Sequence, residues 1–283
     1  MMSFGHPGEV SRPFLIIFTD LDGTLLDHDT YSYRSALPAL RKIRKEGLPL
    51  ILCTSKTITE TESYRRRLRN TDPFIVENGA AVFIPAGYFP SPIPRSSRRG
   101  GYEVISLGFS PEEARKALNN IGRKSGLSLT GLSEMSAARV RRLTGLSRVQ
   151  ASRARDRQYT EPFIVEGEKP GDRRILQEEA RAEGVTLTRG GRFWHLSGGG
   201  DKGEAAMILT GLYRGMVGKV LTVGLGDSLN DFPLLDAVDI PRLVRKPGGD
   251  YQRGVPGKRV RITEGIGPAG WNQAVLEAIR ETD

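Results

Sequence analysis

Near its N-terminus the chain reads Phe14-Leu15-Ile16-Ile17-Phe18-Thr19-Asp20-Leu21-Asp22-Gly23-Thr24. The run begins with five consecutive apolar residues, a pattern typical of a strand that is buried on both faces in a parallel sheet. Two carboxylates, Asp20 and Asp22, follow the apolar run directly. The stretch therefore predicts a buried strand whose C-terminal end carries acidic side chains.

Two strand–helix units follow this first strand. Apolar residues recur at helical spacing over residues 32–46, and residues 48–53 form a second apolar run. A polar helix over residues 59–69 and a third strand over residues 74–76 come next. Strands and helices that alternate at these lengths indicate right-handed crossovers in a parallel sheet.

The pattern changes after Pro85. Proline and glycine are frequent over residues 85–101, and strands and helices alternate less regularly as far as about residue 188. We interpret residues 86–188 as an inserted second domain of α/β type. The parallel sheet is expected to resume with a strand over residues 193–196.

Two more elements complete the expected core, a helix over residues 202–213 and a buried strand over residues 220–225. The predicted fold class is therefore α/β, with a doubly wound, mainly parallel, Rossmann-like core formed by residues 14–85 and 189–283. The inserted domain is expected to form an α/β cap on this core. Residues 1–13, which are rich in glycine and proline, are expected to form a flexible arm.

The composition is that of an ordinary globular protein, with 38% hydrophobic and 27% charged residues in a chain of 283. No stretch approaches the roughly 18–20 consecutive apolar residues of a membrane span, and the run at residues 14–18 is too short for a signal peptide. A single cysteine, Cys53, excludes an internal disulfide and fits a reducing compartment. We therefore expect a cytoplasmic protein without a membrane partner.

The formal net charge of +9 comes largely from the basic residues of segment 86–188. Such residues can contact nucleic acid, face the solvent, or line a pocket for a small anionic molecule. The segment lacks a clear alternation of aromatic and basic residues and any nucleic-acid-binding motif. No nucleic-acid partner is therefore expected.

Polar side chains lie where three of the expected strands end. These side chains are Asp20, Asp22, Thr54, Ser55, Asp227 and Asp231. In an open parallel sheet the C-terminal ends of the strands meet in one crevice, which is the usual ligand site. The sequence therefore predicts a single polar site at this edge of the sheet.

Four carboxylates in one crevice repel one another unless a cation neutralises them. Ligands that are all oxygen atoms point to a hard ion, and a small number of them points to Mg²⁺. Lys202, at the start of a helix, adds a positive charge, and the combination suits a phosphoryl group. Asp20 is then a candidate nucleophile that forms an aspartyl-phosphate, with Asp22 as general acid and base.

The motifs at residues 20–24, Thr54, Lys202 and residues 226–231 resemble the four motifs of the haloacid dehalogenase superfamily of phosphatases. The insert also lies where one subclass of that superfamily carries an α/β cap. The resemblance implies that Asp20 is nucleophile and metal ligand and that Asp22 is the acid and base and binds the metal through its backbone carbonyl. It also implies that Asp227 is a metal ligand and that Asp231 orients water on the metal. The resemblance assigns the phosphoryl oxygens to Thr54 and Lys202.

Three shorter motifs resemble the mannosyl-3-phosphoglycerate phosphatases. They are Thr54-Ser55-Lys56-Thr57 with Glu60, Glu77-Asn78-Gly79, and Tyr159-Thr160-Glu161-Pro162-Phe163. The resemblance implies hydrolysis of a small phosphorylated sugar–glycerate substrate to phosphate and mannosylglycerate, a compatible solute. Candidate substrate contacts are Thr54, Ser55, Lys56, Asn78, Gly79, Arg157, Tyr159, Glu161, His195 and Asn230.

Several alternatives remain open at this stage. Another sugar phosphatase of the superfamily is a close rival, acting on glucosyl-3-phosphoglycerate or sucrose phosphate. Phosphomannomutase shares the Asp-x-Asp pattern but returns the phosphate to a sugar. A nucleic-acid-binding protein on this fold is a further alternative, supported only by the basic cap. The protein is expected to be a monomer or a homodimer.

Overall fold

The computed structural model describes residues 13–190, 193–255, 257 and 259–282. The arm expected at residues 1–13 therefore lies, apart from Pro13, outside the described residues. The chain divides into two compact units, one formed by Met1–Ile51 with Ala206–Asp283 and the other by Leu52–Ala205. Among the described helices, none has both the length and the hydropathy needed to cross a membrane.

The first unit contains four parallel strands in the order β13-β12-β11-β1. They are β1 (Phe14–Thr19), β11 (Val220–Gly226), β12 (Ile240–Arg245) and β13 (Arg261–Ile266). In β1, Ile16, Ile17 and Phe18 are fully buried, as the uninterrupted apolar run predicts. The predicted buried strand and its parallel sheet are thus confirmed.

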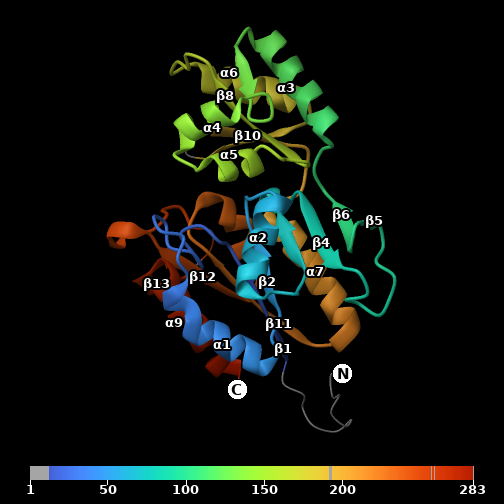
Figure 1. The fold of residues 1–283 in the computed structure, drawn as a ribbon, viewed down its shortest axis with the longest axis vertical. Coiled ribbons are helices and arrows are strands. Elements are labelled where there is room, and N and C mark those ends of the chain that lie inside the picture. Colours follow the sequence, from blue (N-terminus) through green and yellow to red (C-terminus); the bar gives the residue numbers. More distant parts are fainter. Residues whose placement is uncertain (1–12, 191–192, 256, 258, 283) are drawn as a thin grey trace. The chain divides into compact units, whose positions relative to one another are not determined.

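Helices α1 (Leu37–Glu46), α8 (Phe232–Ala237) and α9 (Gly267–Thr282) complete the first unit, with most of α7 (Lys202–Val217). Helix α1 ends at Gly47, which has a φ of 64° and supplies the left-handed residue that such ends favour. Helix α9 packs beside α1 and against β12 and β13 (Figure 1).

In the second unit, β2 (Leu50–Cys53), which begins in the first unit, pairs in parallel with β3 (Phe74–Val76). Helix α2 (Ile58–Leu68) connects them, and Thr57 and Glu60 form a capping box at its start. The next strands, β4 (Ala81–Pro85), β6 (Tyr102–Ser106) and β5 (Ser97–Arg99), are antiparallel.

The second unit also holds an antiparallel sheet with the order β7-β8-β10-β9. Its strands are β7 (Leu129–Gly131), β8 (Thr160–Val165), β10 (Phe193–Ser197) and β9 (Thr186–Gly190). Helices α3 (Pro111–Ser125) and α6 (Asp172–Ala182) pack on one face through a cluster that includes Phe163 and Trp194. Helices α4 (Ala137–Thr144) and α5 (Arg148–Ala154) contribute to a second cluster, which includes Ile164 and Phe193.

The prediction that residues 193–196 return to the parallel sheet was wrong. These residues form β10, which is antiparallel to both β8 and β9. A short apolar run carries no information about which distant strand it will pair with, so its sheet cannot be read from its own residues. The four-stranded sheet consequently runs past the expected border of the insert at residue 188. At the other end, β6 pairs with β4 and β5 pairs with β6, so these two strands do not belong to that four-stranded sheet.

Candidate active site

Three carboxylates of the first unit meet where β1 and β11 end. The backbone N–H of Asp20 donates to the carbonyl of Leu225 at 2.9 Å, so the residue after β1 is held beside the C-terminal end of β11. Carboxylate oxygens of Asp20, Asp227 and Asp231 lie within 4.8 Å of one another. The three residues are 6%, 7% and 1% exposed. The structure therefore brings these three predicted residues together at the carboxyl edge of the sheet.

The short loop between β11 and the turn η3 (Leu229–Asp231) orients two of these carboxylates. Asp231 Oδ2 accepts the backbone N–H groups of Asp227 and Ser228, both at 3.0 Å. The hydroxyl of Ser228 donates to Asp227 Oδ2 at 2.9 Å. A Cβ at Gly226 would lie 2.3 Å from the Cβ of Asp231, so only glycine lets this loop close. The Gly-Asp-x-x-x-Asp pattern is thus a folded unit that presents both side chains.

Gly23 performs a similar role on the β1 side. It has a φ of 76°, and a Cβ there would lie 3.0 Å from Asp227 Oδ2. The hydroxyl of Thr24 donates to Asp227 Oδ1 at 3.3 Å. The Asp-x-Asp-Gly-Thr stretch therefore also holds the distant Asp227 in place.

Asp22 is the exception among the four predicted carboxylates. It is partly exposed and does not belong to the cluster of three within the described part of the chain. The chain turns at Leu21, whose carbonyl accepts the N–H groups of Thr24 at 3.3 Å and Leu26 at 2.8 Å. Asp22 lies inside this turn, whereas Asp20 directly follows β1.

The donor set of the cluster fits a hard divalent cation. All the available ligand atoms are carboxylate oxygens, which Mg²⁺ prefers, and three buried negative charges at this spacing repel one another without a cation. Asp20 and Asp227 are the residues that would hold the ion, with the Asp231 carboxylate beside them.

Trp271 of α9 supports the same site and was not identified from the sequence. Its indole N–H donates to the hydroxyl of Thr19 at 2.8 Å, and that hydroxyl donates to the carbonyl of Asp20 at 2.7 Å. Trp271 and Thr19 are both fully buried. The indole therefore fixes the peptide of the candidate nucleophile. No sequence signal points to this contact, because the two residues are 252 positions apart.

In the second unit, the loop after β2 contains Thr54, Ser55 and Lys56. Thr54 is 1% exposed, and its backbone N–H donates to the carbonyl of Ile75 at 3.0 Å. Its hydroxyl accepts the N–H of Lys56 at 3.2 Å, and its carbonyl accepts the N–H of Asn78 at 3.0 Å. The loop after β2 and the turn after β3 are thus joined directly.

Gly79 places that turn against the start of α7. It has a φ of 96°, and a Cβ there would lie 2.1 Å from the carbonyl of Asp201 and 2.5 Å from the nitrogen of Lys202. The Lys202 side chain is fully buried, and Asp201 Oδ1 caps the helix by accepting the N–H groups of Gly203 and Glu204 at 2.8 Å. The second unit therefore brings Thr54, Asn78, Gly79 and Lys202 together.

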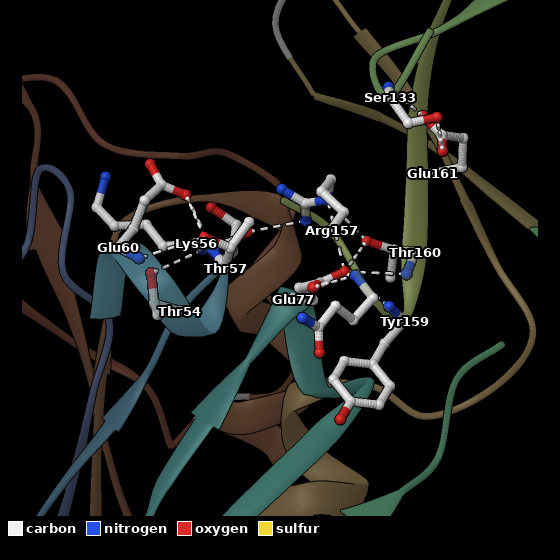
Figure 2. Close-up of polar contacts among 12 residues, drawn as sticks. Thr54, Lys56, Thr57, Glu60, Glu77, Ser133, Arg157, Tyr159, Thr160 and Glu161 are labelled. Carbon is white, nitrogen blue, oxygen red and sulfur yellow. Dashed lines mark hydrogen bonds and ion pairs between the residues drawn. The ribbon is translucent and has the colours of Figure 1, made fainter. Parts of the chain in front are cut away.

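Two candidate substrate contacts, Tyr159 and Glu161, are buried and have partners within the chain; Figure 2 shows Glu161 beside Ser133. Tyr159 is 7% exposed, its ring packs edge-on against Phe83, and its hydroxyl accepts from Arg99 at 3.3 Å. Glu161 is 3% exposed and accepts the N–H of Ser133 at 3.0 Å and its hydroxyl at 2.7 Å. Burial raises the pKa of Glu161 despite these hydrogen bonds.

His195 and Asn230 complete the predicted contacts. His195 lies on β10 opposite Pro162, and burial, with a smaller effect of the Arg157 charge, lowers its pKa to about 4. The imidazole is therefore neutral at pH 7, and its buried Nδ1 has no hydrogen-bond partner among the described residues. Asn230 is exposed, in the turn η3 of the first unit.

Comparisons with known proteins agree with this architecture. Residues 17–89 match the family model of haloacid dehalogenase-like hydrolases. A glucosyl-3-phosphoglycerate/mannosyl-3-phosphoglycerate phosphatase of Methanococcoides burtonii is 45% identical over 93% of this chain and 97% of its own. A mannosyl-3-phosphoglycerate phosphatase of Pyrococcus furiosus is 37% identical over 81% of this chain and 90% of its own.

A solved structure from Bacteroides thetaiotaomicron, described among phosphatases of the same superfamily, is similar in fold. Its TM-score is 0.64 at 16% identity, and the match covers 99% of each chain. The chain therefore belongs to the haloacid dehalogenase-like phosphatases and is an enzyme that hydrolyses phosphoric monoesters. Within that class, its family is that of the glucosyl-3-phosphoglycerate/mannosyl-3-phosphoglycerate phosphatases.

Proposed function

We propose that this enzyme is a Mg²⁺-dependent phosphatase that hydrolyses mannosyl-3-phosphoglycerate to mannosylglycerate and phosphate. The observation that carries the chemistry is the group of three buried aspartates at the ends of β1 and β11. The names of the relatives support the substrate.

In the proposed reaction, a carboxylate oxygen of Asp20 attacks the phosphorus atom, and the bond between phosphorus and the glycerate oxygen breaks. Asp22 protonates the departing oxygen and then removes a proton from the water that hydrolyses the aspartyl-phosphate. Asp20 and Asp227, with the Asp22 carbonyl, would hold Mg²⁺, which would supply positive charge for the phosphoryl oxygens. Asp231 would orient water on the metal.

Thr54 and Lys202 are the proposed contacts of the phosphoryl oxygens. Both are buried, and the Asn78–Gly79 turn links them within the second unit. A lysine at a helix start is unfavourable for the helix dipole, which supports a role in binding an anion. Ser55, Lys56 and the other predicted contacts are proposed to recognise the rest of the substrate.

We further propose that the inserted segment, expected at residues 86–188, confers substrate specificity. Among its residues and their neighbours, His195 is favoured as a sugar contact, because its imidazole is neutral and its Nδ1 has no hydrogen-bond partner among the described residues. The enzyme is proposed to act in the cytoplasm as a monomer or homodimer.

Glucosyl-3-phosphoglycerate is the second candidate substrate. The relatives with 45% and 43% identity are both named for the glucosyl as well as the mannosyl compound. The two sugars differ in the orientation of one hydroxyl group, so a single binding site can accept both.

Phosphate release from the two phosphoglycerate compounds and from sucrose phosphate, with Mg²⁺ and with excess chelator, tests the proposal. We expect metal-dependent turnover that is fastest on the mannosyl compound. Preference for sucrose phosphate would refute the proposed substrate class, and full activity in excess chelator would refute the proposed Mg²⁺ dependence.

A further inference from the structure

Glu77 is a fully buried carboxylate in the turn after β3 (Figure 2). Its Oε1 accepts the backbone N–H of Gln158 at 2.9 Å, and its Oε2 accepts those of Tyr159 at 3.2 Å and Thr160 at 2.9 Å. The hydroxyl of Thr160 also donates to Oε2, at 2.7 Å. One side chain thus binds three consecutive amides that lie 81 to 83 residues further along the chain.

Arg157 extends this contact to the loop after β2. Its Nε lies 3.5 Å from Glu77 Oε2, and the two side chains are 6% and 0% exposed. Nε donates to the Thr160 hydroxyl at 3.0 Å, and Nη2 donates to the carbonyl of Ser55 at 3.0 Å. The guanidinium therefore connects the segment Arg157–Thr160 with the loop that contains Thr54.

The start of α2 binds the residues just before this segment. The hydroxyl of Thr57 donates to the carbonyl of Arg153 at 3.1 Å, and that of Thr59 donates to Asp156 Oδ2 at 2.6 Å. The backbone N–H of Glu77 donates to the carbonyl of Lys56 at 3.0 Å. Glu77 is thus bonded to both segments, one through its backbone and the other through its side chain.

The backbone of Glu77 adds an independent sign of a specialised role. Its φ is 51°, in the left-handed region that non-glycine residues rarely adopt. Asn78 and Gly79 continue in that region, with φ of 63° and 96°. Strain of this kind persists only where surrounding contacts hold it, and it is often found at functional sites.

We propose that Glu77 is a positioning residue that holds the segment Arg157–Thr160 at a fixed distance from the phosphoryl-binding loop of Thr54. With this segment held in place, contacts to the sugar and glycerate would orient the phosphoryl group for attack and so help to stabilise the transition state. Arg157, which the sequence predicts as a substrate contact, is then a support for this segment. The inference rests on the proposed function for the identity of the substrate.

The test compares Glu77→Gln with the wild type and with Glu166→Gln. Glu166 is an exposed carboxylate of the same unit that accepts from Thr130 and Arg139. We expect amide exchange over residues 157–160 to become at least about tenfold faster in Glu77→Gln only. We also expect its kcat/KM for mannosyl-3-phosphoglycerate to fall at least about tenfold more than its kcat/KM for p-nitrophenyl phosphate, which lacks the sugar and glycerate.

Thr160→Val provides a second test that retains the shape of β8 and removes the hydroxyl that contacts both Glu77 and Arg157. A smaller change in the same direction is expected from it. Unchanged amide exchange in the folded Glu77→Gln protein, or an equal loss of activity on both phosphoesters, overturns the inference. If the wild type cleaves p-nitrophenyl phosphate but no sugar phosphoglycerate, the proposed substrate is wrong, while amide exchange still decides whether Glu77 holds the segment.

Discussion

Replacement of Gly79 with alanine tests whether the turn after β3 sets the position of Lys202. The new Cβ would lie 2.1 Å from the Asp201 carbonyl and 2.5 Å from the Lys202 nitrogen, well inside van der Waals contact. Both neighbours are backbone, so the start of α7 has to move. Overpacking of this kind costs about 1–3 kcal/mol, and the left-handed backbone adds about 1–2 kcal/mol.

The catalytic effect is expected to exceed the effect on stability. A displacement of about 1 Å at a substrate-positioning group lowers the rate by roughly 100-fold. Lys202 is the proposed contact of the phosphoryl group, which every substrate carries. We therefore expect kcat/KM to fall by about this factor on the sugar phosphate and on p-nitrophenyl phosphate alike.

Gly87→Ala is the matched control. Gly87 has a φ of 76°, and a Cβ there would have no atom within 4 Å, so it imposes the backbone strain without the clash. Thermal unfolding and steady-state kinetics of both variants give the comparison. We expect Gly87→Ala to lose about 1–2 kcal/mol of stability and to retain its activity. Wild-type kcat/KM in Gly79→Ala would refute the argument that close backbone contact positions Lys202.

Three further predictions concern the first unit and His195. Asp20→Asn should abolish phosphate release, and an active variant would exclude Asp20 as nucleophile. In chelator the same substitution should raise the unfolding temperature, because it removes one negative charge from the aspartate cluster and so reduces repulsion. Trp271→Phe removes the hydrogen-bond donor to Thr19 and should cost about 1 kcal/mol of stability. It should also lower kcat with little change in KM, and an unchanged kcat would contradict the inference that Trp271 positions Asp20. His195 has its pKa lowered from 6.5 to about 4, so the unfolded chain binds more protons between these values. Stability should fall as the pH drops through this range, by about 3 kcal/mol more in wild type than in His195→Gln. Equal pH dependence of the two proteins in urea titrations would be inconsistent with a histidine whose pKa is lowered by folding.

The candidate catalytic carboxylates could be predicted from the sequence because their position depends on local patterns. An apolar run that ends in Asp20 predicts a buried strand with an acidic end, and a second run ends before Asp227. Parallel strands then bring these ends together whatever the intervening chain does. The cluster of Asp20, Asp227 and Asp231 follows from this arrangement. Asp22 lies in the turn that begins at Leu21 and does not belong to the cluster.

The contacts that support the site were not accessible in the same way, although Glu77 itself belongs to one of the motifs in the sequence. Glu77 and Trp271 act through partners 81 to 83 and 252 positions away. A single sequence carries no mark of which distant residues will pair. For Tyr159 and Glu161 the sequence predicts substrate contacts, and the structure shows that their polar groups have hydrogen-bond partners within the chain.

The sequence by itself determined the class of fold, the carboxylate cluster and the motifs that resemble a phosphatase family. Only the tertiary structure assigned β10 to the antiparallel sheet and showed why Gly79 must be glycine. The physical reason is that hydrophobic periodicity and strand ends are properties of short segments, which neighbouring residues specify. Strand partners, close backbone contacts and buried ion pairs depend on segments that meet only after the chain has folded.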